Sequence, residues 1–353
     1  MSAATGPTGE AGAPADEAPA ALRARTAALI TGCWSTQVIH AAVRLGIPDR
    51  LAAGTSSSEE IAAAAGTHPR STLRLLKALA SLGLCRDLGE GRFELTAAGA
   101  PLRSDAPDSL CALARHWGTR TWSALEHLEQ SVSTGDSWAR GGREGFTSMA
   151  QRPEEAAVLN RSMVEQTLQV ARSIADAYDF SGFREVIDVG GGYGALLAVL
   201  LECNPHLQGA SADLAYMAPE AEAFLASRGL GERARFIPVN FFESLPAAAD
   251  AYLLKYIIHD WSDHDAVEIL RRVRAAAGGR AAVLLIERIM PERIAAACPP
   301  DQAAIVCGDI NMMVATGGLE RTESQYRRLL AAAGLELSRI LPTSSAFHIL
   351  EAH

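Results

Sequence analysis

The second half of the chain alternates short apolar runs with stretches of helical spacing, and this pattern limits the possible folds more than any other feature. Apolar runs of strand length occur at 186–189, 209–213, 235–239, 251–256 and 281–286, and helical stretches such as 195–201 and 267–273 separate them. Strands that alternate with helices form a parallel sheet with helices on both faces. The sequence therefore predicts an α/β domain over 181–353, with a doubly wound, mostly parallel sheet that 335–341 and 346–350 complete as a C-terminal antiparallel hairpin.

The first third of the chain has a different pattern, which predicts a helical domain over 21–106. Apolar residues recur at helical spacing from Leu29 to Leu82, and two short stretches at 83–86 and 89–95 around glycines indicate a β-hairpin. Helices followed by such a hairpin are typical of a winged helix. Arg70, Arg74 and Lys77 could serve DNA binding, but the many apolar residues between them favour a domain that packs and dimerises.

Charge and composition narrow the partners. Acidic residues outnumber basic ones 41 to 32, for a net charge of −9, which argues against nucleic acid or an anionic membrane as the main partner. No apolar run approaches the roughly 20 residues that span a bilayer. Residues 1–20 predict a disordered tail and no signal peptide, and the six scattered cysteines favour a reducing cytoplasm, with neither disulfides nor a metal site. Residues 107–180 predict a helical segment that joins the two domains and lines the substrate pocket.

A glycine-rich turn follows the first strand of the predicted sheet. In open parallel sheets the first strand-to-helix turn approaches the ligand closely, and Gly190, Gly192 and Gly194 stand in that turn. Glycine is needed because a Cβ would block both the tight turn and the ligand. The pattern Gly190-x-Gly192-x-x-Ala195 also satisfies a relaxed dinucleotide fingerprint, so the turn by itself leaves NAD and S-adenosylmethionine open within a Rossmann-like fold.

Two carboxylates favour S-adenosylmethionine. Asp188 precedes the glycines at the strand end, where it would repel a pyrophosphate but suit an ammonium and a sulfonium. Asp213 ends the second strand and is placed to accept both ribose hydroxyls. The alternative for Asp213 is a helix cap or an exposed turn.

Three motifs in order then resemble one enzyme family. The segments 188–194 (DVGGGYG), 255–263 (KYIIHDWSD) and 317–322 (GGLERT) are similar to those of the S-adenosylmethionine-dependent O-methyltransferases that act on caffeic acid, hydroxyindole and bacterial aromatic polyketides. The likeness extends from about Arg23 to the end of the chain. It implies an N-terminal winged-helix domain that forms a homodimer, and an aromatic small molecule as acceptor.

The resemblance also implies roles for individual residues. Gly190 and Gly192 would hold the methionine end of S-adenosylmethionine, and Asp213 its ribose. Lys255, one of only two lysines in the chain, would lie at the adenosine region and Trp261 at the adenine ring. Asn240 stands where the family usually has an aspartate that accepts from the adenine amine, and its carbonyl can still accept. We place Phe241 with this cofactor-binding set.

Methyl transfer to a phenol needs a base, because a phenol with a pKa near ~10 is a poor nucleophile at neutral pH. His259 follows the fourth strand, and its ordinary pKa of about 6.5 would leave it able to accept a proton. Glu287 ends the next strand and could orient His259; the resemblance gives the same role to Glu320. The alternative is that His259 merely precedes a helix capped by 262–265 (SDHD).

The acceptor pocket is expected between the carboxyl edge of the sheet and the helices. Met163, Asn311, Met312 and Met313 are its candidates, because methionines adapt to flat rings and an amide can orient an oxygen. Trp117 and Trp122 are further ones. Each of these residues could equally be a core residue.

Two other functions fit the same sequence. Some relatives use bound S-adenosylmethionine for hydroxylation or decarboxylation, and a winged-helix protein could sense S-adenosylmethionine as a regulator. The pairing of His259 with Glu287 favours methyl transfer over both.

Overall fold

The structure is a computed structural model that describes residues 18–353, except 55–56, 139–142, 248 and 296–297. Of residues 143 and 144 it describes the backbone but not the side chains. Most of the tail predicted for 1–20 therefore lies outside the described residues. The last two residues of that tail belong to a helix instead, because α1 already begins at Pro19. Proline suits the first turn of a helix, where its missing N–H needs no partner.

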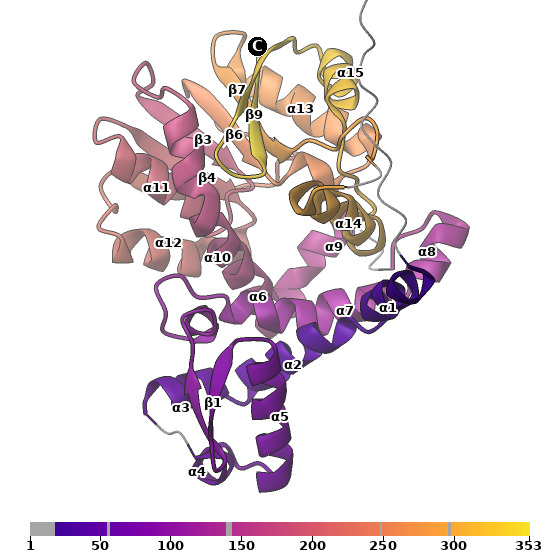
Figure 1. Cartoon of the computed structure of the whole chain (residues 1–353). Helices are drawn as coiled ribbons and strands as arrows, with labels where there is room; N and C mark the ends of the chain where they lie inside the picture. Colours follow the sequence, from indigo (N-terminus) through magenta and orange to yellow (C-terminus); the bar gives the residue numbers. More distant parts are fainter. Residues whose placement is uncertain (1–17, 55–56, 139–142, 248, 296–297) are drawn as a thin grey trace, which may run out of the picture.

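The N-terminal domain is helical with one hairpin, as predicted. Its elements are α1 Pro19–Ile30, α2 Cys33–Arg44, α3 Ile47–Ala52, α4 Ser58–Ala65, α5 Pro69–Ser81, β1 Cys85–Gly89 and β2 Arg92–Leu95. β1 and β2 pair antiparallel. A small core that includes Ile47, Ile61, Leu76 and Phe93 holds the helices against the hairpin, so this lobe has an interior of its own (Figure 1).

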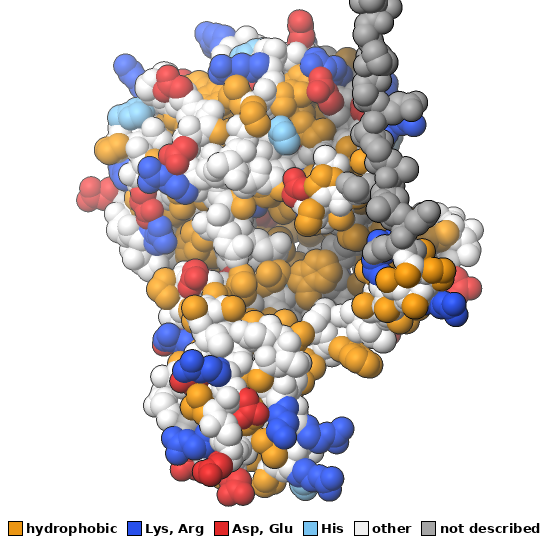
Figure 2. Space-filling view, in the orientation of Figure 1, with side chains coloured by type: hydrophobic (Ala, Val, Ile, Leu, Met, Phe, Trp, Pro, Cys, Tyr) orange, Lys and Arg blue, Asp and Glu red, His pale blue; other side chains and the backbone are white. Residues whose placement is uncertain are grey.

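Helix α1 contributes nothing to that interior. None of its residues is buried, and Leu29, Ile30 and the nearby Trp34 are 76%, 73% and 69% exposed. Figure 2 shows hydrophobic side chains gathered where α1 lies in Figure 1. Large apolar side chains gathered on a surface are typical of an interaction site.

A helical segment connects the two lobes. It contains η1 Ala100–Leu102, α6 Cys111–His116, the π-helical turn η2 Trp117–Thr121, α7 Trp122–Leu125, α8 Leu128–Thr134, α9 Arg143–Thr147, η3 Ser148–Gln151 and the long α10 Pro153–Ala177. Glu165 of α10 accepts hydrogen bonds from the N–H groups of Ala112 (3.0 Å) and Leu113 (2.8 Å) at the start of α6. A carboxylate at a helix N-terminus is favourable, so this contact ties α6 to α10.

The C-terminal domain is the predicted α/β sheet. It consists of β3 Glu185–Val189, α11 Ala195–Cys203, β4 Gln208–Asp213, η4 Ala215–Met217, α12 Ala218–Ser227, β5 Ala234–Pro238, β6 Ala251–Lys255, η5 Ile258–Asp260, α13 Asp263–Ala277, β7 Ala282–Arg288, α14 Pro300–Ala315, α15 Glu323–Ala333, β8 Leu337–Pro342 and β9 Phe347–Ala352. The seven strands lie in the order β5-β4-β3-β6-β7-β9-β8. β9 runs antiparallel to β7 and β8, and the other neighbours are parallel. The structure thus confirms the mostly parallel sheet and its closing hairpin.

The strand order determines where a ligand can bind. The chain runs outward from β3 through β4 to β5, then returns to β6 on the other side of β3. At such a switch point the two connecting segments leave in opposite directions and open a crevice at the carboxyl ends of the strands. Apolar clusters cover both faces of the sheet, so this edge is where polar side chains can gather. Separately, no helix within the described ranges is long and apolar enough to cross a membrane.

Candidate active site

A cavity of about 610 Å³ opens along the carboxyl ends of β3, β4, β6 and β7, and we refer to it as the central cavity. Residues of α6, η2, α9 and α10 line it from the connecting segment, and α14 adds a further wall. Figure 2 shows a hollow with hydrophobic walls between the sheet and the connecting helices. The cavity therefore lies at the switch point of the sheet, within the 300–1,000 Å³ range of small-molecule sites.

The glycine turn forms one end of the central cavity. Gly190 and Gly192 have φ angles of +68° and +56°, a region that residues with a Cβ rarely adopt. A Cβ on Gly190 would overlap Cδ1 of Ile257, and one on Gly191 would lie 2.7 Å from the carboxyl carbon of Asp188. The turn is thus a cradle that only glycine leaves open.

Two buried carboxylates lie beneath that cradle. Asp213 Oδ2 accepts from the N–H of Gly192 (2.8 Å) and Oδ1 from that of Leu214 (2.7 Å), so the carboxylate holds the turn with both oxygens and keeps lone pairs toward the cavity. Burial raises the pKa of Asp213, and these two hydrogen bonds oppose the rise. Burial also raises the pKa of Asp188, to about 7, although Lys255 counteracts it. A cation at this end of the cavity would favour the ionised form of both carboxylates.

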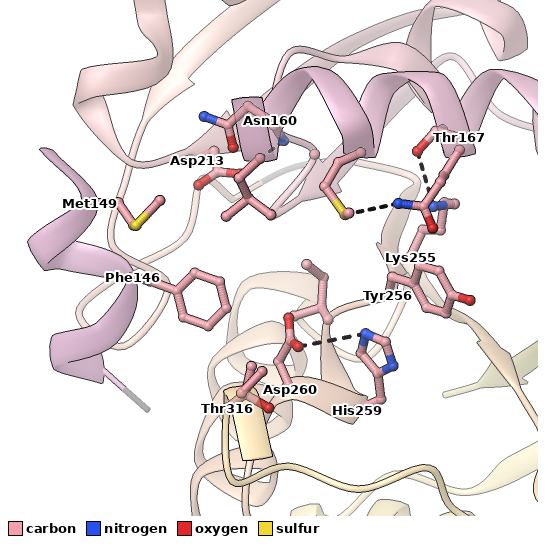
Figure 3. Close-up of a pocket in the computed structure, with 18 of the residues that line it drawn as sticks. Phe146, Met149, Asn160, Thr167, Asp213, Lys255, Tyr256, His259, Asp260 and Thr316 are labelled. Atoms are coloured by element: carbon pink, nitrogen blue, oxygen red, sulfur yellow. Dashed lines mark hydrogen bonds and ion pairs between the residues drawn. The ribbon is translucent and has the colours of Figure 1, made fainter. Parts of the chain in front are cut away.

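Lys255 lies beside Asp188 at the end of β6. Its Nζ donates to Oγ1 of Thr167 on α10 (3.0 Å) and lies 4.6 Å from the ring centroid of Tyr256; Figure 3 shows the Thr167 contact. Burial lowers the pKa of Lys255 to about 8, against the attraction of Asp188. The lysine therefore links the glycine end of the sheet to the connecting segment.

An aromatic cluster forms the wall of the central cavity beyond Asp213. The ring of Trp261 lies edge-on to the rings of Phe241 and Phe242, with centroid distances of 5.8 Å and 4.8 Å. It lies tilted against the ring of Phe146, at a centroid distance of 5.4 Å. Asn240 lies next to them, where its Oδ1 accepts from the N–H of Phe242 (3.1 Å) and its Nδ2 donates to Glu243. Its carbonyl oxygen therefore keeps one lone pair for a further donor. These side chains suit a flat heterocycle with an amine.

His259 projects from the short helix η5 into the central cavity. Its Nδ1 lies 3.2 Å from Oε1 of Glu320, and its Nε2 lies 3.7 Å from Oδ1 of Asp260. The dashed line between Asp260 and His259 in Figure 3 marks the second contact. The second distance exceeds that of a hydrogen bond. One nitrogen is thus held by a carboxylate while the other stays available.

Glu287 differs from the expected arrangement. Its Oε1 accepts from the N–H groups of Ile257 (3.2 Å) and Ile258 (2.9 Å), so it holds the backbone of the turn and makes no hydrogen bond to the His259 ring. The orienting bond that we expected from Glu287 comes from Glu320 instead. The reason is register: Glu287 lies level with the backbone that leaves β6, whereas Glu320 comes from the loop before α15.

Electrostatics around His259 also differ from the expectation of an ordinary histidine. Burial alone would lower its pKa, but the charges of Asp260 and Glu287 and the hydrogen-bonded Glu320 outweigh burial and raise it to about 9. Burial raises the pKa of Asp260 to about 6 and that of Glu287 to about 7. The site without ligand therefore keeps a proton on the imidazole at neutral pH.

One buried arginine holds the backbone of the turn that carries His259. Arg321, fully buried, donates to the carbonyls of Ile258 and Trp261 (both 2.8 Å) and to Asp263. Ser262 caps α13 by accepting from the N–H of Asp265. The cap predicted at 262–265 thus exists and Ser262 supplies it, while the ring of His259 takes no part in this cap.

The acceptor candidates divide. Met163, Asn311 and Met312 line the central cavity, as does Trp117, whereas Met313 and Trp122 do not. Met313 lies about 200° round α14 from Asn311, because successive helical residues point about 100° apart, so it points away from the face that carries Asn311 and Met312. Asn311 Oδ1 is buried and has no hydrogen-bond partner among the described residues, which leaves it able to accept from a ligand.

Several lining residues were missed from the sequence. Phe146 and Thr167 come from the connecting segment, where periodicity indicates helices but not which face meets the sheet. Tyr256 follows Lys255 directly and has a φ of +55°. Its ring stacks on that of His259, with 4.4 Å between the ring centroids and 3° between the ring planes. Arg288 follows Glu287 and also lines the cavity. The adjacency of these last two to motif residues was the available signal.

Within the part of the chain that the structure describes, no group of three or more His, Cys, Asp or Glu side chains could hold a metal ion.

Comparison with known proteins assigns both parts of the chain. Residues 27–104 match the model of an O-methyltransferase dimerisation domain, and residues 125–336 match that of an O-methyltransferase domain. O-Demethylpuromycin-O-methyltransferase of Streptomyces alboniger is 37% identical over 334 residues, which cover 93% of this chain and 88% of that protein.

Solved structures agree with that assignment. The crystal structure of LaPhzM superposes with a TM-score of 0.89 at 36% identity and covers 94% of this chain and 99% of its own. An O-methyltransferase from neocarzinostatin biosynthesis, solved with S-adenosylmethionine and 2-hydroxy-5-methyl naphthoic acid, has a TM-score of 0.76 at 33% identity, with 90% and 95% coverage.

Proposed function

Because the chain belongs to the S-adenosylmethionine-dependent O-methyltransferase family, we propose that His259 is the general base that removes the proton of a phenolic hydroxyl on an aromatic natural-product intermediate. The observation that carries the proposal is the ring geometry. Glu320 occupies Nδ1, Nε2 has no hydrogen bond, and the ring borders the central cavity.

The cofactor end of the cavity supports the binding part of the proposal. S-adenosylmethionine supplies an electrophilic methyl group on a sulfonium, which is already a good leaving group. Gly190 and Gly192 would hold the methionine end, above the negative charge of Asp188. Asp213 would accept the ribose hydroxyls with the lone pairs that its backbone hydrogen bonds leave free.

The aromatic wall supports adenine binding in the same way. Phe241 and Trp261 would enclose the adenine ring, and Asn240 would accept from its amine with the remaining carbonyl lone pair. Lys255 would act at the methionine end and not at the adenosine region that we expected, because its charge favours the ionised form of Asp188.

A raised pKa of His259 is compatible with a role as base once the cavity is filled. An imidazolium is stabilised by the carboxylates around it, and a cation that shares the cavity opposes that stabilisation. His259 then gives up its proton more readily, and Nε2 becomes the acceptor for the hydroxyl proton. Glu320 holds the other nitrogen protonated, which is the tautomer this role requires.

The acceptor would be flat and apolar with few polar groups. Met163 and Met312 can adapt to an aromatic ring, and Asn311 can accept from a hydroxyl or amine on it. Relatives that act on aromatic compounds support this class, such as the enzyme solved with a hydroxynaphthoic acid.

The direct test is turnover by the His259→Ala variant. We expect incubation of the wild type with S-adenosylmethionine and a panel of hydroxybenzoates, hydroxynaphthoates and hydroxyphenazines to add 14 mass units to an acceptor; the variant should lose at least about 100-fold in kcat, the size of a general-base contribution. Its affinity for S-adenosylmethionine, measured by calorimetry, should change less than about twofold. Full turnover by the variant, a tenfold loss of cofactor affinity, or loss of carbon dioxide without methyl gain would contradict the proposal.

We also propose that the chain forms a homodimer through its N-terminal part and that its domains divide near 106 and 180. The dimerisation-domain match over 27–104 and the exposed apolar side chains of α1 support the dimer. The order of helical, connecting and sheet elements supports the division.

A further inference from the structure

Arg288 belongs to the buried group around His259, although the base proposal does not use it. It ends β7, its side chain is 16% exposed, and it lines the central cavity. Its Nη2 donates to Oε1 of Glu320. That oxygen is the same one that faces Nδ1 of His259 at 3.2 Å, so one carboxylate oxygen serves both side chains.

Glu320 needs a cationic partner to stay ionised. Its side chain is completely buried, and burying a carboxylate without compensation favours the protonated form. Its Oε2 has no hydrogen-bond partner among the described residues. Arg288 and His259 are thus the two groups that stabilise the charge, and His259 must lose its own proton during turnover. Only Arg288 stays cationic throughout, because a guanidinium does not lose its proton in proteins.

The tautomer of His259 depends on that charge. An ionised Glu320 can only accept, so it keeps the proton on Nδ1 and leaves the lone pair of Nε2 toward the cavity. A protonated Glu320 could donate to Nδ1 and place the ring proton on Nε2, where it would block the removal of a proton from an acceptor. The state of Glu320 therefore decides whether His259 can act as a base.

A second observation shows that the fold makes room for this arginine. Gly308 lies inside α14, and a Cβ there would overlap Nη2 of Arg288. Glycine is unfavourable in the middle of a helix, and φ at Gly308 is not in the left-handed region. The guanidinium therefore occupies the space that a Cβ at position 308 would take.

We propose that Arg288 is a positioning residue that keeps Glu320 ionised and aimed at His259, with Gly308 as the gap that admits its guanidinium. Arg288 also lies 5.2 Å from the ring centroid of Tyr256, which stacks on His259. Arg288 therefore contacts Glu320 and Tyr256, and both of these side chains lie against the imidazole of His259. The inference rests on the proposed role of His259.

Several charged groups face this cluster, and the test must take all of them into account. They come from the end of β6 and the following turn, from β7, from α14, and from the loop and helix near α15: Lys255, Tyr256, Asp260, Glu287, Asp309, Arg321 and Tyr326. All of them are unchanged in the variants below, so a shift in His259 reports on Arg288 itself.

The test compares Arg288→Met and Gly308→Ala with Arg339→Met. Arg339 is the matched control because it also pairs with a glutamate, Glu351, and lies over a tyrosine ring, that of Tyr178, outside the central cavity. Turnover is measured with the phenol from the panel above that gives most product. We expect both Arg288→Met and Gly308→Ala to lower kcat at least tenfold at pH 7, with cofactor affinity within about twofold and the control at wild-type kcat.

Gly308→Ala separates positioning from folding. It keeps every charge and adds a better helix former to α14, so a wild-type circular dichroism spectrum and a cooperative thermal transition should show a folded protein while its kcat falls. Nitrogen-15 NMR of labelled histidines, with His259 assigned by its loss in His259→Gln, gives a readout that needs no acceptor. In Arg288→Met the nitrogen-15 shifts of the neutral His259 ring should show its proton on Nε2 and no longer on Nδ1, because a Glu320 without its cationic partner takes up a proton and donates it to Nδ1.

Each outcome decides. Wild-type kcat in Gly308→Ala, or an unchanged Nδ1–H tautomer of His259 in Arg288→Met, would overturn the role of Arg288. Full turnover by His259→Ala would instead overturn the base proposal, whatever the arginine variants do. Loss of kcat in Arg339→Met to the same extent would show a general effect of arginine removal and would also overturn the inference.

Discussion

The raised pKa of His259 can be tested by removing the charge of Asp260. The pKa of about 9 lies above the ordinary 6.5, so the fold favours the imidazolium by roughly 3 kcal/mol. After burial, which acts in the opposite direction, Asp260 is the largest contributor, with Oδ1 3.7 Å from Nε2. An opposite charge at that distance is worth at least about one pKa unit. We therefore expect Asp260→Asn to lower the His259 midpoint by about one unit.

A base must be neutral, and about 1% of His259 is neutral at pH 7 when its pKa is 9. By lowering that pKa, Asp260→Asn should increase the fraction of His259 that can accept a proton at pH 7. In the protein without cofactor, nitrogen-15 NMR should give a midpoint near 9 for the wild type and a lower one for Asp260→Asn. The stability that a raised histidine pKa contributes is complete below about pH 6.5 and is lost as the pH rises through 9. Unfolding in urea at pH 6 and pH 9 should show this loss, and the variant should lose less.

The control is His264→Gln, because His264 is exposed in the neighbouring helix and its removal should leave the His259 midpoint unchanged. A wild-type midpoint at or below 6.5, or an unchanged midpoint in Asp260→Asn, would refute the assignment of the shift to these carboxylates.

Further predictions concern the cofactor end and the dimer. Asp213→Ala removes the acceptor of two backbone N–H groups, so it should weaken S-adenosylmethionine binding at least about tenfold in calorimetry and lower the Tm; unchanged affinity would exclude a ribose contact. Gly190→Ala should lower the free energy of unfolding by more than about 1 kcal/mol and weaken cofactor binding, whereas Gly229→Ala has a similar positive φ without a clash and should show only the backbone cost. Leu29→Glu places a charge on the exposed apolar face of α1 and should convert a dimer to a monomer in sedimentation experiments; a dimer of wild-type affinity would place the interface elsewhere.

The helices of the connecting segment illustrate the limit of sequence periodicity. The spacing of apolar residues predicts helices over 107–180, and the structure has them. It does not show that Phe146 would face Trp261 or that Thr167 would meet Lys255. Those contacts depend on how α9 and α10 lie against the sheet, which tertiary packing decides.

Glu287 and Glu320 show the same limit within the site. Both carboxylates could be selected for the neighbourhood of His259, one from its strand end and one from the family motif. Which of them bonds the ring depends on the height of each oxygen relative to Nδ1, and therefore on the register of β7 against β6 and on the path of the loop before α15. A sequence contains no direct measure of either.

The sequence by itself determined the α/β sheet with its closing hairpin, the helical N-terminal part, the glycine turn with its two carboxylates, and membership of a methyltransferase family. These follow from local rules, because periodicity, glycine content and the order of motifs act over short stretches of chain. Tertiary structure alone decided that Met312 and not Met313 faces the cavity, that Arg288 and Glu320 stand behind His259, and that the imidazole is surrounded by carboxylates. Hydrogen bonds, burial and pKa are properties of distance in space, and the residues that set them here lie far apart in the chain: 61 positions separate His259 from Glu320, and 88 separate Thr167 from Lys255.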